Sequence, residues 1–260
     1  MTTPDAEVSD ARRAVDVPPP AERVQRTTLP NGVRVVTDDM PGARSAALSV
    51  WVTVGGRDEP DELAGASHFL EHLLFKGTPE RDARSIARDI DSVGGDMNAF
   101  TASEHTVYYA RVPAGAIEFG ADLLFDVVGA PALRGDDFEA ERGVILEELA
   151  AVEDDPDDVL GIQLFEALFP DHPLGREVLG SEDSIAALTR DAVAQFMQRW
   201  YVPRNLVVVG AGMVDHRWLV DEVAARFGDD SSGASPERVA PVGSVVGRVV
   251  DERSVELAHL

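Results

Sequence analysis

The run His68-Phe69-Leu70-Glu71-His72 constrains this chain more than any other part of its sequence. In an α-helix, positions i and i+4 lie one above the other on the same face, so His68 and His72 can both point at one metal ion. Glu71 flanks that face and is the nearest group that could accept a proton from water at the metal. The order H-x-x-E-H is the inverse of the H-E-x-x-H order found in many zinc enzymes. The alternative interpretation is a polar helix face with two solvated histidines.

The residues around the motif favour a helix over 65–76. Apolar side chains stand at positions 66, 69, 70, 73 and 74, which recur at helical spacing and would bury one face while the histidines occupy another. Gly77 and then Pro79 follow, and both are typical of the end of a helix.

A catalytic zinc site uses three protein ligands and keeps one position open for water, so two histidines leave one ligand to find. The segment 141–149 offers three carboxylates. Glu141 and Glu148 are seven positions apart and share a helix face, whereas Glu147 points about 100° away from Glu148. Spacing alone does not choose among the three. An acidic solvated face is the competing interpretation, because the chain has 47 acidic residues against 23 basic ones.

Together these motifs resemble those of the M16 zinc metallopeptidases, the family of insulysin, pitrilysin and the mitochondrial processing peptidase. The stretch 68–78 is similar to the family signature almost throughout, and the resemblance extends over about 28–215. Its further segments are 94–101, 104–108, 172–176 and 201–206. The chain resembles the catalytic N-terminal half of a smaller, bacterial-type member.

The resemblance implies a zinc-dependent endopeptidase that hydrolyses peptides or unfolded protein segments, with one Zn²⁺ per chain. His68, His72 and Glu148 would be the zinc ligands. Glu71 would be the general base that activates zinc-bound water. Glu141 would orient a histidine through its other ring nitrogen.

The same resemblance implies how substrate and partner bind. Asn98, Ala99 and Phe100 would form a strand that pairs with the substrate peptide; an ordinary hairpin strand after a Gly-Gly turn is the alternative. The partner would be a second M16-type half, a homodimer mate or a sister subunit. A non-catalytic partner or structural subunit with the same fold is the alternative function.

Strand and helix patterns predict an α+β fold. Hairpins with helices grouped between them argue for a two-layer sandwich, a mainly antiparallel sheet with helices packed on one face. We expect a disordered leader at 1–22, a catalytic domain at 23–228, a linker at 229–240 and the truncated start of a second homologous repeat at 241–260.

Composition excludes several other classes. A net charge of −24 argues against a nucleic-acid partner, because phosphate binding needs basic patches. No run approaches the roughly 18 consecutive apolar residues of a membrane span, so a cytoplasmic location is expected. The chain has no cysteine. A Cys zinc site is therefore impossible, and so is S-ribosylhomocysteine lyase, which has a similar H-x-x-E-H helix but uses a Cys ligand.

Overall fold

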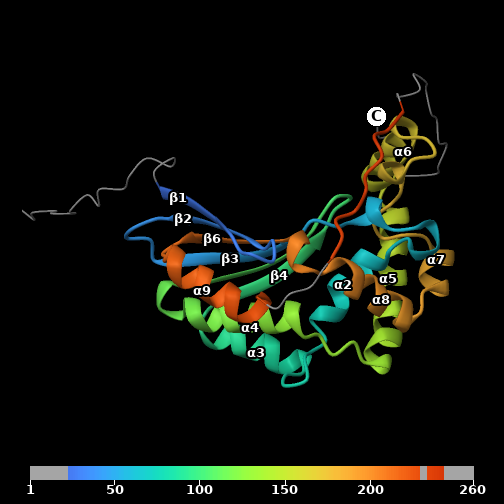
Figure 1. Ribbon diagram of the computed structural model, residues 1–260. Helices are drawn as coiled ribbons and strands as arrows, with labels where there is room; N and C mark the ends of the chain where they lie inside the picture. The colour runs from blue at the N-terminus through green and yellow to red at the C-terminus, as the bar shows by residue number, and fades with distance from the viewer. Residues whose placement is uncertain (1–22, 229–232, 243–260) are drawn as a thin grey trace, which may run out of the picture.

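One six-stranded sheet organises the protein, whose computed structural model describes residues 23–228 and 233–242 (Figure 1). The strand order is β1-β2-β6-β3-β5-β4. The strands are β1 (Val24–Thr28), β2 (Arg34–Asp39), β3 (Ser45–Val52), β4 (Asp96–Thr101), β5 (Thr106–Pro113) and β6 (Leu206–Gly212). Alternate residues of β3 are buried, as expected of a strand with one face on the core.

Helices cover one face of this sheet and extend past one of its ends. Figure 1 shows α3, α4 and α9 beneath the sheet and α2, α5, α7 and α8 at one end. The helices are α2 (Ala66–Leu74), α3 (Ala83–Ser92), α4 (Ile117–Gly129), α5 (Gly135–Asp154), α6 (Pro156–Leu168), α7 (Glu182–Ala187), α8 (Arg190–Trp200) and α9 (His216–Phe227). The described residues also form five short 3₁₀ helices: η1 (Gly56–Asp58), η2 (Asp61–Leu63), η3 (Ala114–Ala116), η4 (Pro173–Gly175) and η5 (Pro203–Asn205). The predicted α+β sandwich is confirmed.

The first hairpin shows how the sequence sets the edge of the sheet. Asn31 and Gly32 form the turn between β1 and β2, and Gly32 has φ +100°, a left-handed conformation that costs glycine little. The backbone N–H groups of Leu29 and Gly32 bond within the turn, to the Val33 and Leu29 carbonyls.

The place of β6 in the sheet was not foreseen from the sequence. This strand lies between β2 and β3, parallel to β2 and antiparallel to β3. Successive residues of β6 alternate between buried and partly exposed positions, and Val208 is fully buried. Every other strand pairing is antiparallel, so the sheet is mainly antiparallel, as predicted.

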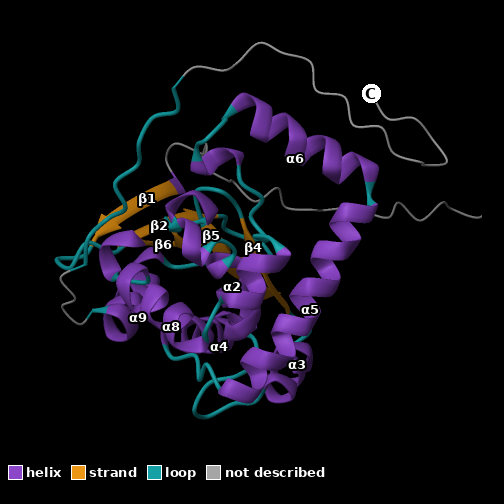
Figure 2. Ribbon diagram, turned by 90° about the vertical axis from the view of Figure 1, so that its right-hand side faces the viewer, coloured by secondary structure: helices purple, strands orange, loops and turns teal. Residues whose placement is uncertain are grey.

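Helices α5 and α6 illustrate the remaining boundaries. The longest helix, α5, has 20 residues and is rich in carboxylates. In Figure 2 α5 runs up to α6, which turns away from it at Asp155, the N-cap residue of α6.

Within the described part of the chain, no helix has both the length and the apolar character to cross a bilayer. The predictions for 1–22 and for most of 241–260 concern residues outside the described ranges.

Candidate metal centre

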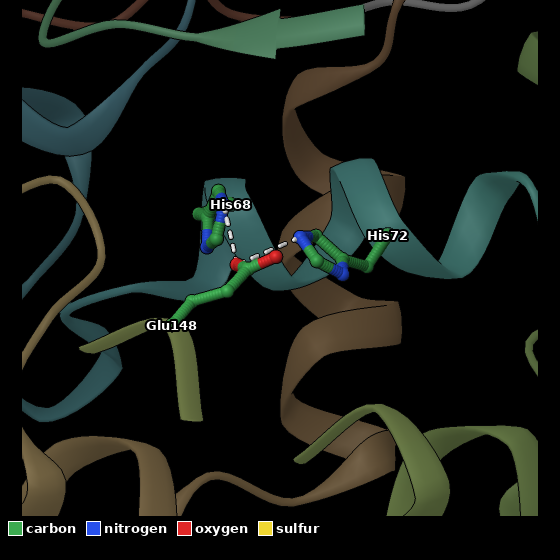
Figure 3. Close-up of side chains that lie close together, drawn as sticks. All are labelled: His68, His72 and Glu148. Atoms are coloured by element: carbon green, nitrogen blue, oxygen red, sulfur yellow. Dashed lines mark ion pairs between the residues drawn. The ribbon is translucent and has the colours of Figure 1, made fainter. Parts of the chain in front are cut away.

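Three ligand atoms converge at the end of the sheet. Glu148 Oε2 lies 3.7 Å from His68 Nε2 and 3.4 Å from His72 Nε2, and all three ligand atoms lie within 4.8 Å of one another. Figure 3 shows both imidazoles on α2 turned toward the Glu148 carboxylate, which comes from α5. Two imidazole nitrogens and one carboxylate oxygen form a donor set suited to zinc, and the set leaves room for a fourth ligand.

Packing between α2 and α5 brings these side chains together. Phe69 of α2 stacks on Phe138 of α5 with ring centroids 4.3 Å apart, and both rings are buried. Leu70 and Leu73 are buried on the same side of α2 as Phe69. The histidines occupy the other side of the helix, as the apolar spacing predicted.

The structure distinguishes the three carboxylates that spacing left open. Glu148 faces the two histidines, whereas Glu147 is exposed and lies outside the cluster. Glu141 shares a helix face with Glu148 but lies nearer the start of α5, behind His72. Its Oε2 is 3.0 Å from His72 Nδ1. That contact selects the tautomer in which Nδ1 carries the proton and Nε2 presents its lone pair to a metal.

Lys76 completes the support behind His72. Its Nζ lies 2.6 Å from Glu141 Oε1, and Glu141 has only 6% of its side chain exposed. Lys76 is the one lysine of the chain. A buried carboxylate that both accepts from an imidazole and pairs with a cation is compensated on both oxygens, which fixes its orientation.

His68 is held neutral by its surroundings. Burial, together with the smaller effect of the neighbouring His72, lowers the pKa of His68 to about 4. A metal-binding imidazole must be unprotonated, so His68 is ready to bind at neutral pH. Its Nδ1 is buried and has no hydrogen-bond partner among the described residues, in contrast to Nδ1 of His72.

Glu71, the residue before His72 in α2, lies near enough to His72 and Glu148 for their charges to act on its carboxylate. Thr101 Oγ1 donates a 2.5 Å hydrogen bond to Glu71 Oε2. Burial raises the pKa of Glu71, while the Thr101 hydrogen bond opposes that shift. Sequence reasoning missed Thr101; the only available signal was its place directly after 98–100. The contact joins the proposed base to the end of β4.

The residues expected to bind substrate lie on an open edge. β4 is the last strand in the sheet order and pairs only with β5 among the described strands. Asn98 is exposed and Phe100 is 43% exposed, while Ala99 packs partly against the core. The Phe100 ring meets Trp51 edge-on at 6.3 Å. The outer edge of β4 therefore pairs with no other described strand, which is the arrangement that strand addition requires. On this strand the Ala99 amide donates to Asn98 Oδ1 at 2.8 Å, so a substrate strand would have to replace that bond.

A second residue missed in the sequence holds the start of α2. The N-cap, Gly65, has no side chain, and Glu59 takes its place. Glu59 Oε2 accepts from the Gly65 amide at 2.8 Å, and Oε1 accepts from the Ser67 amide at 2.6 Å. These amides would otherwise be orphan donors at the helix start. Burial raises the pKa of Glu59 to about 7, against the opposing effect of these backbone hydrogen bonds.

We expect the stability of the protein to fall as pH rises because of Glu59. Its pKa rises from 4.5 to about 7 on folding, so the native state binds more protons than the unfolded chain between these values. The free energy of unfolding therefore decreases by up to about 3 kcal/mol from pH 4.5 to 7 through this group. Urea unfolding at several pH values should show that Glu59→Gln lacks this decrease. Glu62→Gln, an exposed carboxylate of η2, should keep it; a wild-type-minus-variant difference that is constant with pH would contradict the assignment.

Two sequence profiles of known families match this chain. The sequence profile described as Insulinase (Peptidase family M16) matches residues 34–182, which is more than half of the chain. A second profile, described as Peptidase M16 inactive domain, matches residues 187–260. The described part of the second match includes β6, which lies inside the same sheet as the strands of the first match.

Individual relatives are similar over most of this chain. An uncharacterized zinc protease of Mycobacterium leprae is 53% identical, covering 91% of this chain and 54% of that protein. A probable mitochondrial-processing peptidase subunit beta of Arabidopsis thaliana is 37% identical, covering 80% of this chain and 39% of that protein. The crystal structure of a protease from Helicobacter pylori matches with a TM-score of 0.76 and 26% identity, covering 82% of this chain and 53% of that one. The chain thus spans about half the length of these relatives.

Proposed function

The chain belongs to peptidase family M16, and on that premise we propose that it is the catalytic half of a zinc-dependent endopeptidase. The observation that carries the proposal is the convergence of His68, His72 and Glu148 on one point, with Glu71 on the same helix face. A structural subunit would gain nothing from burying His68 with its Nδ1 unpartnered among the described residues, because an unpaired buried polar group costs stability.

Each residue has a distinct part in the proposed hydrolysis. His68, His72 and Glu148 would hold a zinc ion, which would supply Lewis-acid chemistry to water and to the scissile carbonyl. Glu71 takes a proton from the attacking water, whose oxygen forms the new bond to the carbonyl carbon. Glu71 then passes that proton to the leaving nitrogen as the C–N bond breaks. Its raised pKa suits a group that must both accept and release a proton.

The proposed substrate is an extended peptide or an unfolded protein segment. The unpaired edge of β4, with Asn98, Ala99 and Phe100, supplies main-chain donors and acceptors to such a strand. A folded protein offers few free strands of this kind. The Arabidopsis relative is named as a processing peptidase subunit, which is consistent with peptide substrates for this family.

A second half is part of the proposal. The relatives are about twice the length that this chain covers, and one of them is named as a subunit. We propose that a second M16-type half, in the same polypeptide or in a partner chain, encloses the substrate over the open side of the metal site. The non-catalytic subunit remains the competing function.

Metal content and chelation test this function. We expect about one zinc per chain by elemental mass spectrometry, and cleavage of an unstructured reporter peptide by the chain together with its second half. Removal of zinc with 1,10-phenanthroline should abolish cleavage, and added Zn²⁺ should restore it. One zinc per chain with no cleavage in the complete protein would favour the non-catalytic subunit instead.

Loss of the Thr101 hydroxyl should weaken the base without touching the metal. Thr101→Val keeps the size of the side chain but removes the donor to Glu71. We expect kcat to fall by about tenfold, because a misplaced general base loses part of its contribution, while zinc content and KM stay close to wild type. Thr27→Val, at the opposite edge of the sheet, is the matched control. A kcat equal to wild type would show that this hydrogen bond does not hold the base.

A further inference from the structure

The segment 233–242, called the strap here, lies against the residues around η1 and against the turn after β4. Figure 1 shows it in red, rising past the end of the sheet toward α6. It has no helix or strand of its own. It is attached instead by side-chain contacts: Asn205 Nδ2 donates to the Ala234 carbonyl, and Arg57 Nη2 donates to the Val239 carbonyl at 2.8 Å. His172 Nε2 lies 3.1 Å from the same Val239 oxygen.

Arg238 makes the most extensive of the strap's contacts. Its guanidinium pairs with both carboxylate oxygens of Asp58, with Nε to Oδ1 at 2.9 Å and Nη2 to Oδ2 at 2.7 Å. The same Nη2 lies 3.1 Å from the Thr53 carbonyl oxygen and 2.6 Å from the Glu104 carbonyl oxygen. The planar fork of an arginine can join three segments in this way, whereas the point charge of a lysine cannot.

Two of the three segments that Arg238 joins carry the supports of the active centre. Asp58, whose side chain is 1% exposed, ends η1, and the next residue is Glu59, which holds the start of α2. Glu104 lies in the turn after β4, close to Thr101 and its bond to Glu71. Backbone hydrogen bonds connect the same two segments, from the amides of Gly56 and Arg57 to the carbonyls of Ala102 and Ser103.

Arg238 compensates the buried negative charge of Asp58. A carboxylate that is almost fully buried needs a cation and hydrogen-bond donors. Arg238 is the cation paired with it in the described structure, and the Gly55 amide is a further donor, at 3.0 Å from Oδ2. Arg57 ties to the other side of the turn, where its Nη1 lies 2.6 Å from Glu104 Oε1. The strap, η1 and the turn after β4 are therefore all connected to one another, next to the start of α2 and the end of β4.

We propose that Arg238 is a positioning residue for the hydrolysis proposed above. It holds the Thr101 end of β4 at a set distance from α2, the helix that carries His68 and His72. The strap in this view is part of the support of the active centre rather than a passive connection. Arg238 touches neither the metal ligands nor the proposed base, so it acts through Asp58 and through the β4–β5 turn. The proposal rests on the proposed peptidase function for its kinetic consequences only.

The first test is kinetic and uses the complete protein with its second half. Arg238→Gln should lower kcat by about 10- to 100-fold, because displacement of a reacting group by roughly 1 Å has effects of this size. Zinc content should stay at the wild-type value, and KM should change less than kcat. Arg238→Lys keeps the charge beside Asp58 but not the fork, and should give an intermediate kcat. Arg190→Gln, an exposed arginine of α8 that pairs with Asp191, is the matched control and should match wild type.

A double-mutant cycle separates positioning from a general loss of stability. If Arg238 acts through Thr101, the two substitutions disturb the same interaction. The fold-decrease in kcat of the double variant Arg238→Gln/Thr101→Val should then be smaller than the product of the fold-decreases of the two single variants. Effects that multiply independently, or a kcat for Arg238→Gln within twofold of wild type, would overturn the proposal.

Hydrogen exchange keeps the test independent of peptidase activity. In Arg238→Gln the amides of Gly56 and Arg57 should exchange at least tenfold faster than in wild type, since they bond to the turn that Arg238 holds. Amides of α8 should be unchanged. If the complete wild-type protein cleaves no peptide, the proposed function fails, yet faster exchange at these two amides would still support the clamp. Unchanged exchange would overturn it whatever the activity.

Discussion

Replacement of Glu71 by Gln is expected to abolish peptide cleavage while leaving the metal in place. The amide has the size of the carboxylate and can still accept the hydrogen bond from Thr101 Oγ1. It cannot take a proton from water at neutral pH, so the general-base contribution, on the order of 10²- to 10⁴-fold in kcat, is lost. Glu71 is not one of the three clustered ligands, so zinc content should stay at the wild-type value.

The control for this variant is Glu147→Gln. Glu147 is a carboxylate of α5 next to Glu148, but it is exposed and lies outside the cluster. It should keep full activity, which would show that removal of one negative charge near the site is not the cause. Cleavage by Glu71→Gln at the wild-type rate would refute the assigned base, and with it the proposed hydrolysis.

His72→Ala is expected to remove zinc from the protein. The variant loses one of three ligands and also the partner of Glu141, which would then be buried with only Lys76 to compensate it. Loss of an outer partner of a metal ligand costs about 10- to 100-fold in metal affinity, so loss of the ligand itself should cost more than roughly 100-fold. Titration against a chromophoric zinc chelator gives the affinity, and elemental analysis gives the content.

Glu141→Gln provides the graded comparison. It keeps the side chain behind His72 but weakens the bond to Nδ1 and the pairing with Lys76, so an affinity between wild type and His72→Ala is expected. Equal zinc affinity in His72→Ala and wild type, with the fold intact by circular dichroism, would mean that His72 is not a ligand.

Local patterns were enough to predict much of this protein. The apolar spacing around 66–74 predicted α2, and the Asn31-Gly32 turn predicted the first hairpin, because both signals lie within a few residues. Helical spacing predicted that Glu141 and Glu148 share a face. It did not show that Glu148 lies at Nε2 of His72 and Glu141 at Nδ1. Only the angle at which α5 packs on α2 places one carboxylate before the histidines and the other behind them.

Contacts between distant segments could not be read from the sequence. Thr101 reaches Glu71, 30 positions away in the sequence, because β4 ends beside α2. Arg238 lies 180 positions from Asp58. Each is an ordinary polar residue in its own neighbourhood, and its partner is set by packing. The parallel pairing of β6 with β2 is the same kind of case, since no turn connects the two strands.

The central position of β6 imposes an order on biosynthesis. β2 ends at Asp39 and β6 begins at Leu206, so at ~5–20 residues per second the ribosome needs roughly 10–30 seconds to deliver the strand that joins β2 to β3. Until then both strands have an unsatisfied edge in the middle of the unfinished sheet, and such edges readily pair with other chains. A nascent chain stalled before Leu206 would therefore be an aggregation-prone species, and chaperone capture should be strongest over this interval of synthesis.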